Sequence, residues 1–227
     1  MKKMLFISNI TKSITNFSLP SILAGQNLGY EFHMAANYSE FYDDESRYNI
    51  TLHHIDLVRN PLSLKNINAY RQLLRLIKKE KFNVIHCNTP IGGVLGRLCG
   101  NKAKVPKIIY SAHGFHFYKG APLINRTLFK WAEMWLAHYT DVIITMNEED
   151  YQAAKNFKLR NNGKVYFIPG VGIDIKLFQI DGVNKDELRK SLRLKQDDIV
   201  LIAMGDLINR KNYASSIRAI AKASNKK

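Results

Sequence analysis

The stretch NVIHCNTPIGGVLGRLCGNKAKVPKIIYSA (residues 83–112) carries the pattern that decides the fold. Asn83–His86 is strand-like, and Lys107–Ala112 predicts a second, buried strand. Between them a Thr-Pro pair precedes a segment, residues 92–99, that is expected to begin a helix. A strand, a helix and a further strand in this order are typical of a parallel sheet.

The same alternation extends in both directions from residues 83–112. Strands are expected at residues 3–8, 31–36, 141–146 and 164–168, and helices at residues 14–28, 66–79 and 122–139. The helix at 66–79 has an expected apolar face of Ile67, Tyr70, Leu74 and Ile77. Asn147 is suited to cap a further helix that starts with three acidic residues. The chain is therefore predicted to be α/β, with a Rossmann-like, doubly wound parallel sheet covered by helices on both faces.

After residue 178 the sequence becomes more polar and charged. Residues 1–178 are expected to form one domain, and residues 179–198 a linker with a charged helix. Residues 199–204 predict a new buried strand, which is followed by a final helix. One strand and two helices cannot bury a core of their own. Residues 199–227 are therefore expected to be the incomplete start of a second domain.

Composition restricts the class of protein. Of the 227 residues, 46% are hydrophobic and 23% are charged, which is typical of a soluble globular chain. No run approaches the roughly 20 apolar residues that cross a bilayer. The two cysteines do not form a CxxC pair, so neither a disulfide framework nor a Cys-rich zinc site is expected. These features predict a cytoplasmic protein.

Charge is unevenly distributed along the chain. The formal net charge is +15, and residues 57–132 contain fourteen basic residues and one acid, Glu80. Such a block indicates either a surface that meets an anionic partner or a generally basic, solvated face. Nucleic acid, an acidic membrane face and phosphorylated small molecules all qualify as that partner.

Polar, glycine-containing and histidine-containing segments follow the predicted strands. They are residues 8–13, 86–93, 113–120 and 169–174. Doubly wound sheets bind ligands at the carboxyl ends of their strands, so these segments are the candidate site.

Two groups of residues within these segments could carry chemistry. Gly92 and Gly93 open a helix and either admit a ligand to the backbone or allow close helix packing. His113 and His116 either contact sugar hydroxyls and a leaving group or are structural histidines. A zinc site formed with His86 is not expected, because the loops show no carboxylate or cysteine at ligand spacing.

Arg210 and Lys211 follow the predicted strand at residues 199–204. Two cations before a helix suit a bound phosphate, although a solvated pair of charges is an equal alternative. The sequence contains no GxxxxGK[ST], GxGxxG or GxSxG motif, so P-loop, kinase and hydrolase functions lose their main support.

Taken together, five segments resemble the bacterial family 4 glycosyltransferases. They are FSLP (17–20), HCNTPIGG (86–93), HGFHFYKG (113–120), NEEDY (147–151) and PGVGID (169–174). The similarity covers essentially the whole chain and is greatest to the branch that builds capsular polysaccharide, exopolysaccharide or glycan-lipid units. The resemblance implies a GT-B enzyme, in which an acceptor domain and a nucleotide-sugar domain face each other across a cleft. It also implies transfer with retention of configuration, from a UDP-sugar, without a metal or other cofactor.

The resemblance also assigns roles to single residues. His113 matches the cleft histidine that contacts the donor sugar near the reacting centre and is the predicted catalytic residue. The acceptor-side positions are Asn9, His86, Asn88, Gly92, Gly93, Gly114 and His116. The cleft loop is Pro169, Gly170, Val171 and Asp174, and the donor-phosphate residues are Gly205, Arg210 and Lys211. The positive charges of Arg210 and Lys211 suit this role because they would neutralise the negative charge of the departing diphosphate.

The sequence departs from the family pattern at several positions. Ser18 stands where a histidine is frequent, Asp206 where Arg or Glu is frequent, and Asn212 where Gly is frequent. The Glu-x7-Glu pair that grips the donor is absent, so the chain is expected to be truncated early in the donor domain and impaired in transfer.

The expected partners are a nucleotide sugar, a glycan or polyprenyl-diphosphate acceptor, and the inner face of the cytoplasmic membrane as an anionic surface. The alternative function is a non-catalytic acceptor- or membrane-binding module that pairs with a separate donor-domain chain. Nucleic-acid binding ranks third, because no recognised DNA- or RNA-binding motif is present.

Overall fold

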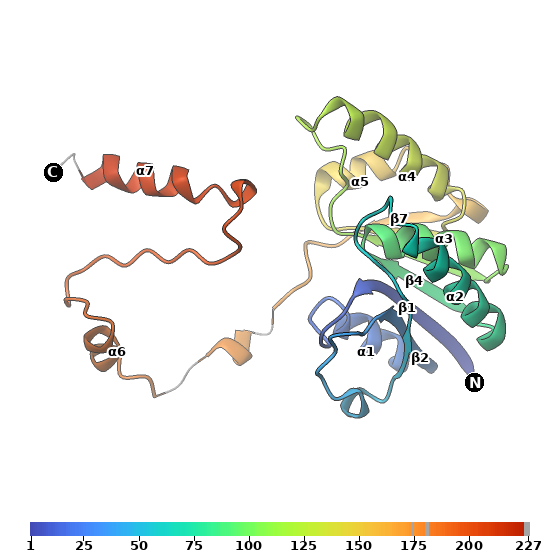
Figure 1. Cartoon of the computed structure of the whole chain (residues 1–227), viewed down its shortest axis with the longest axis horizontal. Coiled ribbons are helices and arrows are strands. Elements are labelled where there is room, and N and C mark those ends of the chain that lie inside the picture. The colour runs from blue at the N-terminus through green and yellow to red at the C-terminus, as the bar shows by residue number, and fades with distance from the viewer. Residues whose placement is uncertain (174, 180–181, 225–227) are drawn as a thin grey trace. The chain divides into compact units, whose positions relative to one another are not determined.

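The computed structural model describes residues 1–173, 175–179 and 182–224 of the chain. The chain divides into two compact units, Met1–Ile173 and Asp174–Lys227. Within its described residues, the first unit contains a single sheet with helices on both faces, and the second consists of short helices joined by extended chain (Figure 1).

Seven parallel strands form the sheet of the first unit, in the order β3-β2-β1-β4-β5-β6-β7. The strands are β1 (Lys2–Ile10), β2 (Tyr30–Asn37), β3 (Thr51–His54), β4 (Val84–Asn88), β5 (Lys107–Ala112), β6 (Val142–Thr145) and β7 (Lys164–Phe167). The order runs outward from β1 on both sides, so the direction of winding reverses between β1 and β4. This confirms the predicted doubly wound α/β sheet. In such sheets, the carboxyl ends of the strands at the reversal form the ligand crevice.

Helices cover the two faces of the sheet unequally. The helices of the first unit are α1 (Leu19–Asn27), α2 (Lys65–Glu80), α3 (Pro90–Lys102), α4 (Lys130–Ala137) and α5 (Glu148–Ala154). Short helical turns lie at Glu45–Tyr48, Asn125–Phe129 and Arg160–Asn162. Helices α2 to α5 contribute to the larger hydrophobic core on one face, whereas α1 packs on the smaller core of the other face (Figure 1). The strands beyond β4 are therefore less covered on the α1 side.

Glycines on α3 allow this helix to lie close to the sheet. An ideal Cβ atom added to Gly96 would lie 2.5 Å from the Cys87 sulfur and 3.0 Å from Ile7 Cδ1. An added Cβ atom at Gly100 would lie 2.8 Å from Ile108 Cδ1. The close approach of α3 to β1, β4 and β5 therefore depends on residues without side chains.

Gly96→Ala is expected to lower the free energy of unfolding by about 1–3 kcal/mol, because the added methyl group forces α3 away from β4. Urea unfolding followed by circular dichroism measures the change. Lys102→Ala, at an exposed position of the same helix, is the control and should change stability little. An unchanged or increased stability of Gly96→Ala would show that the contact relaxes without cost.

A buried ion pair joins α3 to α4. Arg97 is fully buried and bonds Glu133 through two nitrogens, at 2.8 and 3.2 Å. Its Nε also donates to the Gly93 carbonyl at 2.9 Å, and its guanidinium lies 3.9 Å from the centre of the Tyr110 ring. The pair fixes how α4 sits on the core.

The buried face of α2 differs from the expected one. Asn66, Ala69, Leu73 and Ile77 are buried, whereas Ile67 is 49% exposed. The side chain of Asn66 accepts from the Val58 amide and donates to the Asn60 carbonyl. These two bonds hold the start of α2 against the preceding loop and turn Ile67 outward. Tyr70 and Leu74 are only partly buried against the core.

Two further elements differ from the sequence expectation. The helix predicted at residues 14–28 begins only at Leu19, because the Ile14 amide donates to Asp43 and the Thr15 amide donates to Ser18 in a preceding loop. Strand β3 was not predicted, since its four residues include two histidines and show no apolar run.

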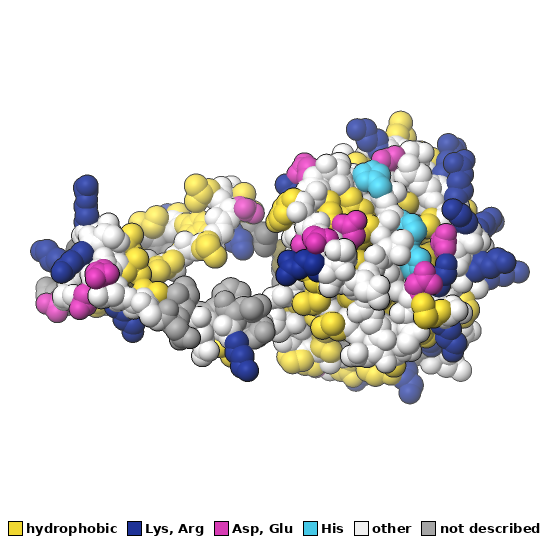
Figure 2. Space-filling view, turned by 90° about the horizontal axis from the view of Figure 1, so that it is seen from below, with side chains coloured by type: hydrophobic (Ala, Val, Ile, Leu, Met, Phe, Trp, Pro, Cys, Tyr) yellow, Lys and Arg dark blue, Asp and Glu magenta, His cyan; other side chains and the backbone are white. Residues whose placement is uncertain are grey.

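The second unit contains α6 (Lys185–Ser191) and α7 (Tyr213–Ser224), with helical turns at Ile175–Phe178 and Asn209–Lys211. The buried strand predicted at residues 199–204 is wrong: this segment is extended and exposed, and it pairs with no strand. A strand needs a neighbour for its backbone hydrogen bonds, and the described residues of this unit include no strand. Exposed hydrophobic side chains are visible on this unit in Figure 2.

Candidate functional site

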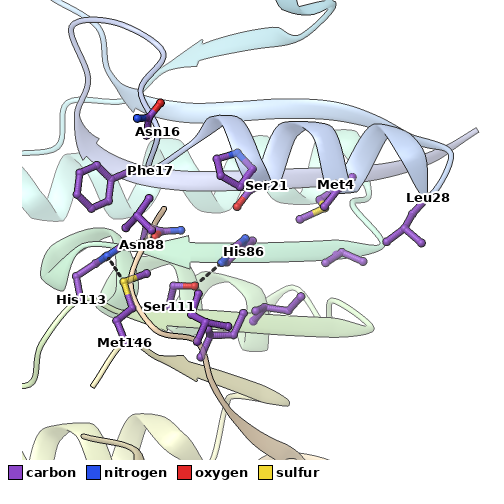
Figure 3. Close-up of a pocket in the computed structure, with 18 of the residues that line it drawn as sticks. Met4, Asn16, Phe17, Ser21, Leu28, His86, Asn88, Ser111, His113 and Met146 are labelled. Atoms are coloured by element: carbon purple, nitrogen blue, oxygen red, sulfur yellow. Dashed lines mark hydrogen bonds between the residues drawn. The ribbon is translucent and has the colours of Figure 1, made fainter. Parts of the chain in front are cut away.

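A pocket of about 430 Å³ lies on the α1 side of the sheet. Helix α1 and the preceding loop form one wall, and the other wall is formed by β4, β5 and the segments that follow β6 and β7 (Figure 3). His86, Asn88, Ser111 and His113 supply four of its polar side chains. We call this cavity the α1-side pocket. It reaches the carboxyl ends of β4 and β5, beside the reversal of the winding.

His113 lies at the mouth of the α1-side pocket, one residue beyond the end of β5. Its Nε2 atom lies 2.6 Å from Asn88 Oδ1, and its Nδ1 atom lies 3.1 Å from the Met146 sulfur. The Phe17 ring meets the imidazole edge-to-face at 5.2 Å between centroids. Because an amide oxygen only accepts, Nε2 carries the proton of the neutral ring. Burial lowers the pKa of His113, which favours this neutral form.

His86 forms a second polar layer deeper in the pocket. It is buried, and its Nε2 atom forms a hydrogen bond with the Ser111 hydroxyl (Figure 3), at 2.8 Å. Its ring meets the Phe6 ring edge-to-face. Burial, and secondarily the charge of His113, lowers the pKa of His86 to about 4. His86 is therefore a neutral hydrogen-bonding group in the folded chain at neutral pH.

This burial predicts a loss of stability in acid. The pKa of His86 is 6.5 when unfolded and about 4 when folded, so the unfolded chain binds the proton more tightly. The stabilisation is complete above pH 6.5 and is lost as pH falls toward 4, by up to about 3 kcal/mol. Urea unfolding at half-unit pH intervals measures the slope. His86→Asn should flatten it and exposed His138→Asn should not; an unchanged slope in His86→Asn would contradict the assignment.

Two buried polar atoms at this end of the sheet lack a partner among the described residues. They are Asn88 Nδ2 and Asn9 Oδ1; a third such atom, Tyr38 Oη, belongs to the residue that follows β2. Leaving such a group unpaired costs about 1–3 kcal/mol. Since Asn88 already accepts from His113 through its oxygen, its free amide nitrogen is available to an acceptor oxygen of a ligand.

The loop after His113 is held by the start of α5. The Asn147 side chain caps this helix by accepting from the Asp150 amide at 2.8 Å, which confirms the predicted cap. Asp150 accepts from the Phe115 amide at 3.0 Å and from Asn147 Nδ2 at 2.7 Å. Burial raises the pKa of Asp150 despite these bonds. The acidic first turn of α5 therefore fixes the backbone that presents His113.

The other predicted residues lie at varied distances from His113. Gly92 lies against the Ser8 backbone and Gly93 against the Tyr110 ring, where a Cβ atom would come within 3.3 and 2.6 Å respectively. Both glycines thus pack α3 on the sheet. His116 is exposed, and its ring meets Phe129 outside the α1-side pocket. Gly114 lies next to His113 with φ of 128°.

The cleft loop and the donor residues are only partly described. Gly170 and Val171 line the α1-side pocket, and Pro169 is exposed beside them. Asp174 and the side chain of Arg210 lie outside the described residues. In the second unit, Gly205 has φ of 150°, and the Lys211 side chain passes within 3.5 Å of an added Cβ atom there.

Two of the lining residues that contact the pocket histidines were not among the predicted site residues. Ser111 and Met146 face the pocket and contact His86 and His113 respectively. The alternation of β5 could have identified Ser111, because it lies two residues before His113 and so shares its face. In the described part of the chain, no group of three or more His, Cys, Asp or Glu side chains could hold a metal ion. None of the helices in that part is long and apolar enough to cross a bilayer.

The family model and two curated relatives that match this chain describe glycosyltransferases. The sequence pattern described as "Glycosyl transferase 4-like" matches residues 3–147. "Putative glycosyltransferase EpsD" of Bacillus subtilis is 36% identical over 225 residues, which cover 97% of this chain and 57% of the relative. A "UDP-Gal:alpha-D-GlcNAc-diphosphoundecaprenol alpha-1,3-galactosyltransferase" of Escherichia coli is 31% identical over 157 residues, covering 69% of this chain and 40% of the relative. The chain thus spans about half the length of the curated relatives it matches.

Solved structures share the fold at low sequence identity. Sucrose-phosphate synthase of Thermosynechococcus elongatus matches this chain with a TM-score of 0.69 at 15% sequence identity. The match covers 98% of this chain and 60% of the synthase chain. Anabaena Alr3699/HepE, solved in complex with UDP and glucose, matches with a TM-score of 0.56 at 15% sequence identity. This match covers 85% of our chain and 50% of the Anabaena chain.

Proposed function

The chain belongs to the glycosyl transferase 4-like family, and from this premise we propose that it transfers a sugar from a UDP-sugar to a glycan or polyprenyl-diphosphate-linked acceptor, with its first unit binding the acceptor. The Escherichia coli relative is named for a UDP-galactose donor and a diphosphoundecaprenol acceptor, and the Anabaena structure contains UDP. Transfer retains the anomeric configuration and uses no metal in this proposal.

The observation that carries the proposal is the neutral His113 ring at the mouth of the α1-side pocket. Asn88 orients it from β4, and Phe17 packs against it from the loop before α1. A neutral imidazole beside an unpaired amide nitrogen is suited to hydrogen-bond sugar hydroxyls without an ionic cost. In the proposal His113 contacts the donor sugar near the reacting carbon. Asn88 and His86 then serve the acceptor side.

In the second unit, Gly205, Arg210 and Lys211 are proposed to stabilise the departing diphosphate. Loss of a nucleoside diphosphate develops negative charge on the leaving oxygen, and preformed cations stabilise that charge. The close approach of the Lys211 side chain to Gly205 supports this grouping.

A second candidate function is a non-catalytic acceptor-binding module that pairs with a separate donor-domain chain. It is favoured by the exposed, unpaired segment at residues 199–204, where the donor side was expected to begin. In that case the chain binds acceptor but transfers sugar only in the presence of its partner.

One assay separates the two functions. The chain is incubated with UDP-galactose, UDP-glucose or UDP-N-acetylglucosamine and a short polyprenyl-diphosphate-GlcNAc acceptor in detergent micelles, and products are identified by mass spectrometry. A parallel reaction adds the part of the Bacillus subtilis relative that this chain does not match. Transfer by the chain alone supports the enzyme, and transfer only with the added polypeptide supports the module. Absence of both transfer and acceptor binding contradicts both.

A further inference from the structure

The helical segment that includes α4 exposes a row of large apolar side chains. Residues 123–137 are continuously helical, and the outward residues are Leu123, Ile124, Leu128, Trp131, Met134 and Trp135. We call these six residues the apolar ridge. Leu123 is 75% exposed and Trp131 is 74% exposed. A contiguous exposed row of this kind, containing both tryptophans of the chain, marks an interaction surface.

The apolar ridge is distinct from the side of the helix that packs on the core. Leu136 and Ala137 are buried, and Glu133 points inward to the buried Arg97. The helix is therefore already anchored to the first unit by its opposite side. Within the described residues, the one ring contact of a ridge side chain is that of Trp135 with Tyr139, edge-to-face at 5.2 Å between centroids.

The charges around the apolar ridge are mainly positive. Lys119, Arg126 and Lys130 border it, and they line a hollow of about 420 Å³ at its edge. The one carboxylate in residues 118–138 is Glu133, which is turned inward and neutralised by Arg97. Glu149 and Asp150 of α5 border the same hollow; Asp150 is buried, and Glu149 is exposed and accepts from the Lys119 amide. Three cations against one exposed carboxylate favour an anionic partner.

We propose that the apolar ridge is a docking face that lies in the surface of a bilayer containing anionic phospholipids. Tryptophan side chains favour the level of the lipid headgroups, and leucines and isoleucine favour the acyl boundary below them. Bordering lysine and arginine side chains bind anionic headgroups. The segment lies in the plane of the membrane surface and does not cross it.

The helix that carries the ridge borders the candidate site with its other side. A hollow of about 450 Å³ is lined by His113 and Gly114 and by Phe129, Ala132 and Leu136 of this helix, whereas the six ridge residues are not among its lining residues. His116 also lines this hollow and packs its ring on Phe129. A lipid-linked diphosphate held at the membrane can approach His113 along this hollow. The approach of the lipid-linked diphosphate to His113 rests on the proposed function. Docking of the ridge on the membrane is independent of it.

The two tryptophans allow a direct test. Vesicles of phosphatidylcholine with 30% phosphatidylglycerol, free of glycan and nucleotide sugar, are titrated into the chain while tryptophan emission is recorded. We expect a blue shift, together with co-sedimentation that weakens as salt rises. Both effects should be much smaller with pure phosphatidylcholine.

Variants identify the docking face. W131A/W135A should lower the partition coefficient about 10-fold or more, measured by sedimentation. R126A/K130A should lower it about 20-fold on anionic vesicles and little on zwitterionic ones. The matched controls are L62A/L64A, two exposed leucines before α2, and K78A/K79A, two exposed lysines of α2. Controls should stay within about threefold of the unaltered chain.

Three results would overturn the proposal. They are no blue shift at low salt, equal sedimentation of W131A/W135A and the unaltered chain, and a lipid-free blue shift that accompanies dimerisation in analytical ultracentrifugation. The last would assign the ridge to a second copy of the chain. Because the transfer assay uses micelles and the vesicles contain no substrate, failure of docking and failure of the proposed function are distinguishable.

Discussion

Replacing Glu133 with alanine is expected to lower the free energy of unfolding by about 3–5 kcal/mol. Arg97 is fully buried, and its only carboxylate partner among the described residues is Glu133. Removing that carboxylate leaves a guanidinium charge in the core with the Gly93 carbonyl and the Tyr110 ring as its remaining contacts. A buried charge without a counter-ion is among the most destabilising changes in a protein. Urea unfolding followed by circular dichroism measures the loss.

The control is Glu148→Ala, which removes an exposed carboxylate from the first turn of α5 and should lower stability by no more than about 1 kcal/mol. The double variant R97M/E133L replaces both charges with apolar groups of similar volume. It should recover most of the loss, because neither charge then needs a partner. If Glu133→Ala were nearly neutral, the Arg97 charge would have to reach water from its buried position.

Replacing His113 with alanine is expected to lower kcat for sugar transfer about 10²–10³-fold. The measurement uses whichever preparation transfers sugar, the chain alone or the chain with added donor-domain polypeptide. The loss follows from the proposed contact between His113 and the donor sugar, which strengthens as the sugar–phosphate bond breaks. Affinity for the acceptor should change by less than about threefold, because the deeper layer of His86 and Ser111 stays intact.

His54→Ala is the control for this experiment, since His54 lies on the edge strand β3 and is exposed. Its kcat should stay within about twofold of the unaltered chain. An equal loss of acceptor affinity and kcat in His113→Ala would instead make His113 part of the acceptor-binding surface.

Local patterns in the sequence were sufficient to predict most strands of the sheet. The apolar runs that became β1, β2 and β4 to β7 are short and bounded by turn residues, and six of the seven strands were predicted from them. The loops at their carboxyl ends then placed Asn88 and His113 near each other, because parallel strands end at the same edge. The 2.6 Å contact between these two residues agrees with that inference.

Features that depend on distant residues could not be predicted in the same way. Arg97 and Glu133 are separated by 36 residues, and nothing local shows that an arginine in α3 is buried. The face of α2 is set by the bonds of Asn66 to a loop rather than by the spacing of its apolar residues. Residues 199–204 have the composition of a strand but no neighbouring strand among the described residues, and composition alone does not reveal that.

The central position of β1 has a consequence for the order of folding. The strand formed by the first ten residues lies between β2 and β4, and Lys3 bonds to both Asn83 and Glu80. During synthesis, β1 can pair with β2 early. Its other edge is covered only when β4 has been made, about 80 residues after the end of β1. Until then, that edge presents unpaired backbone groups that can associate with other chains. Once β4 has docked, β5, β6 and β7 each add to a growing edge soon after they are made.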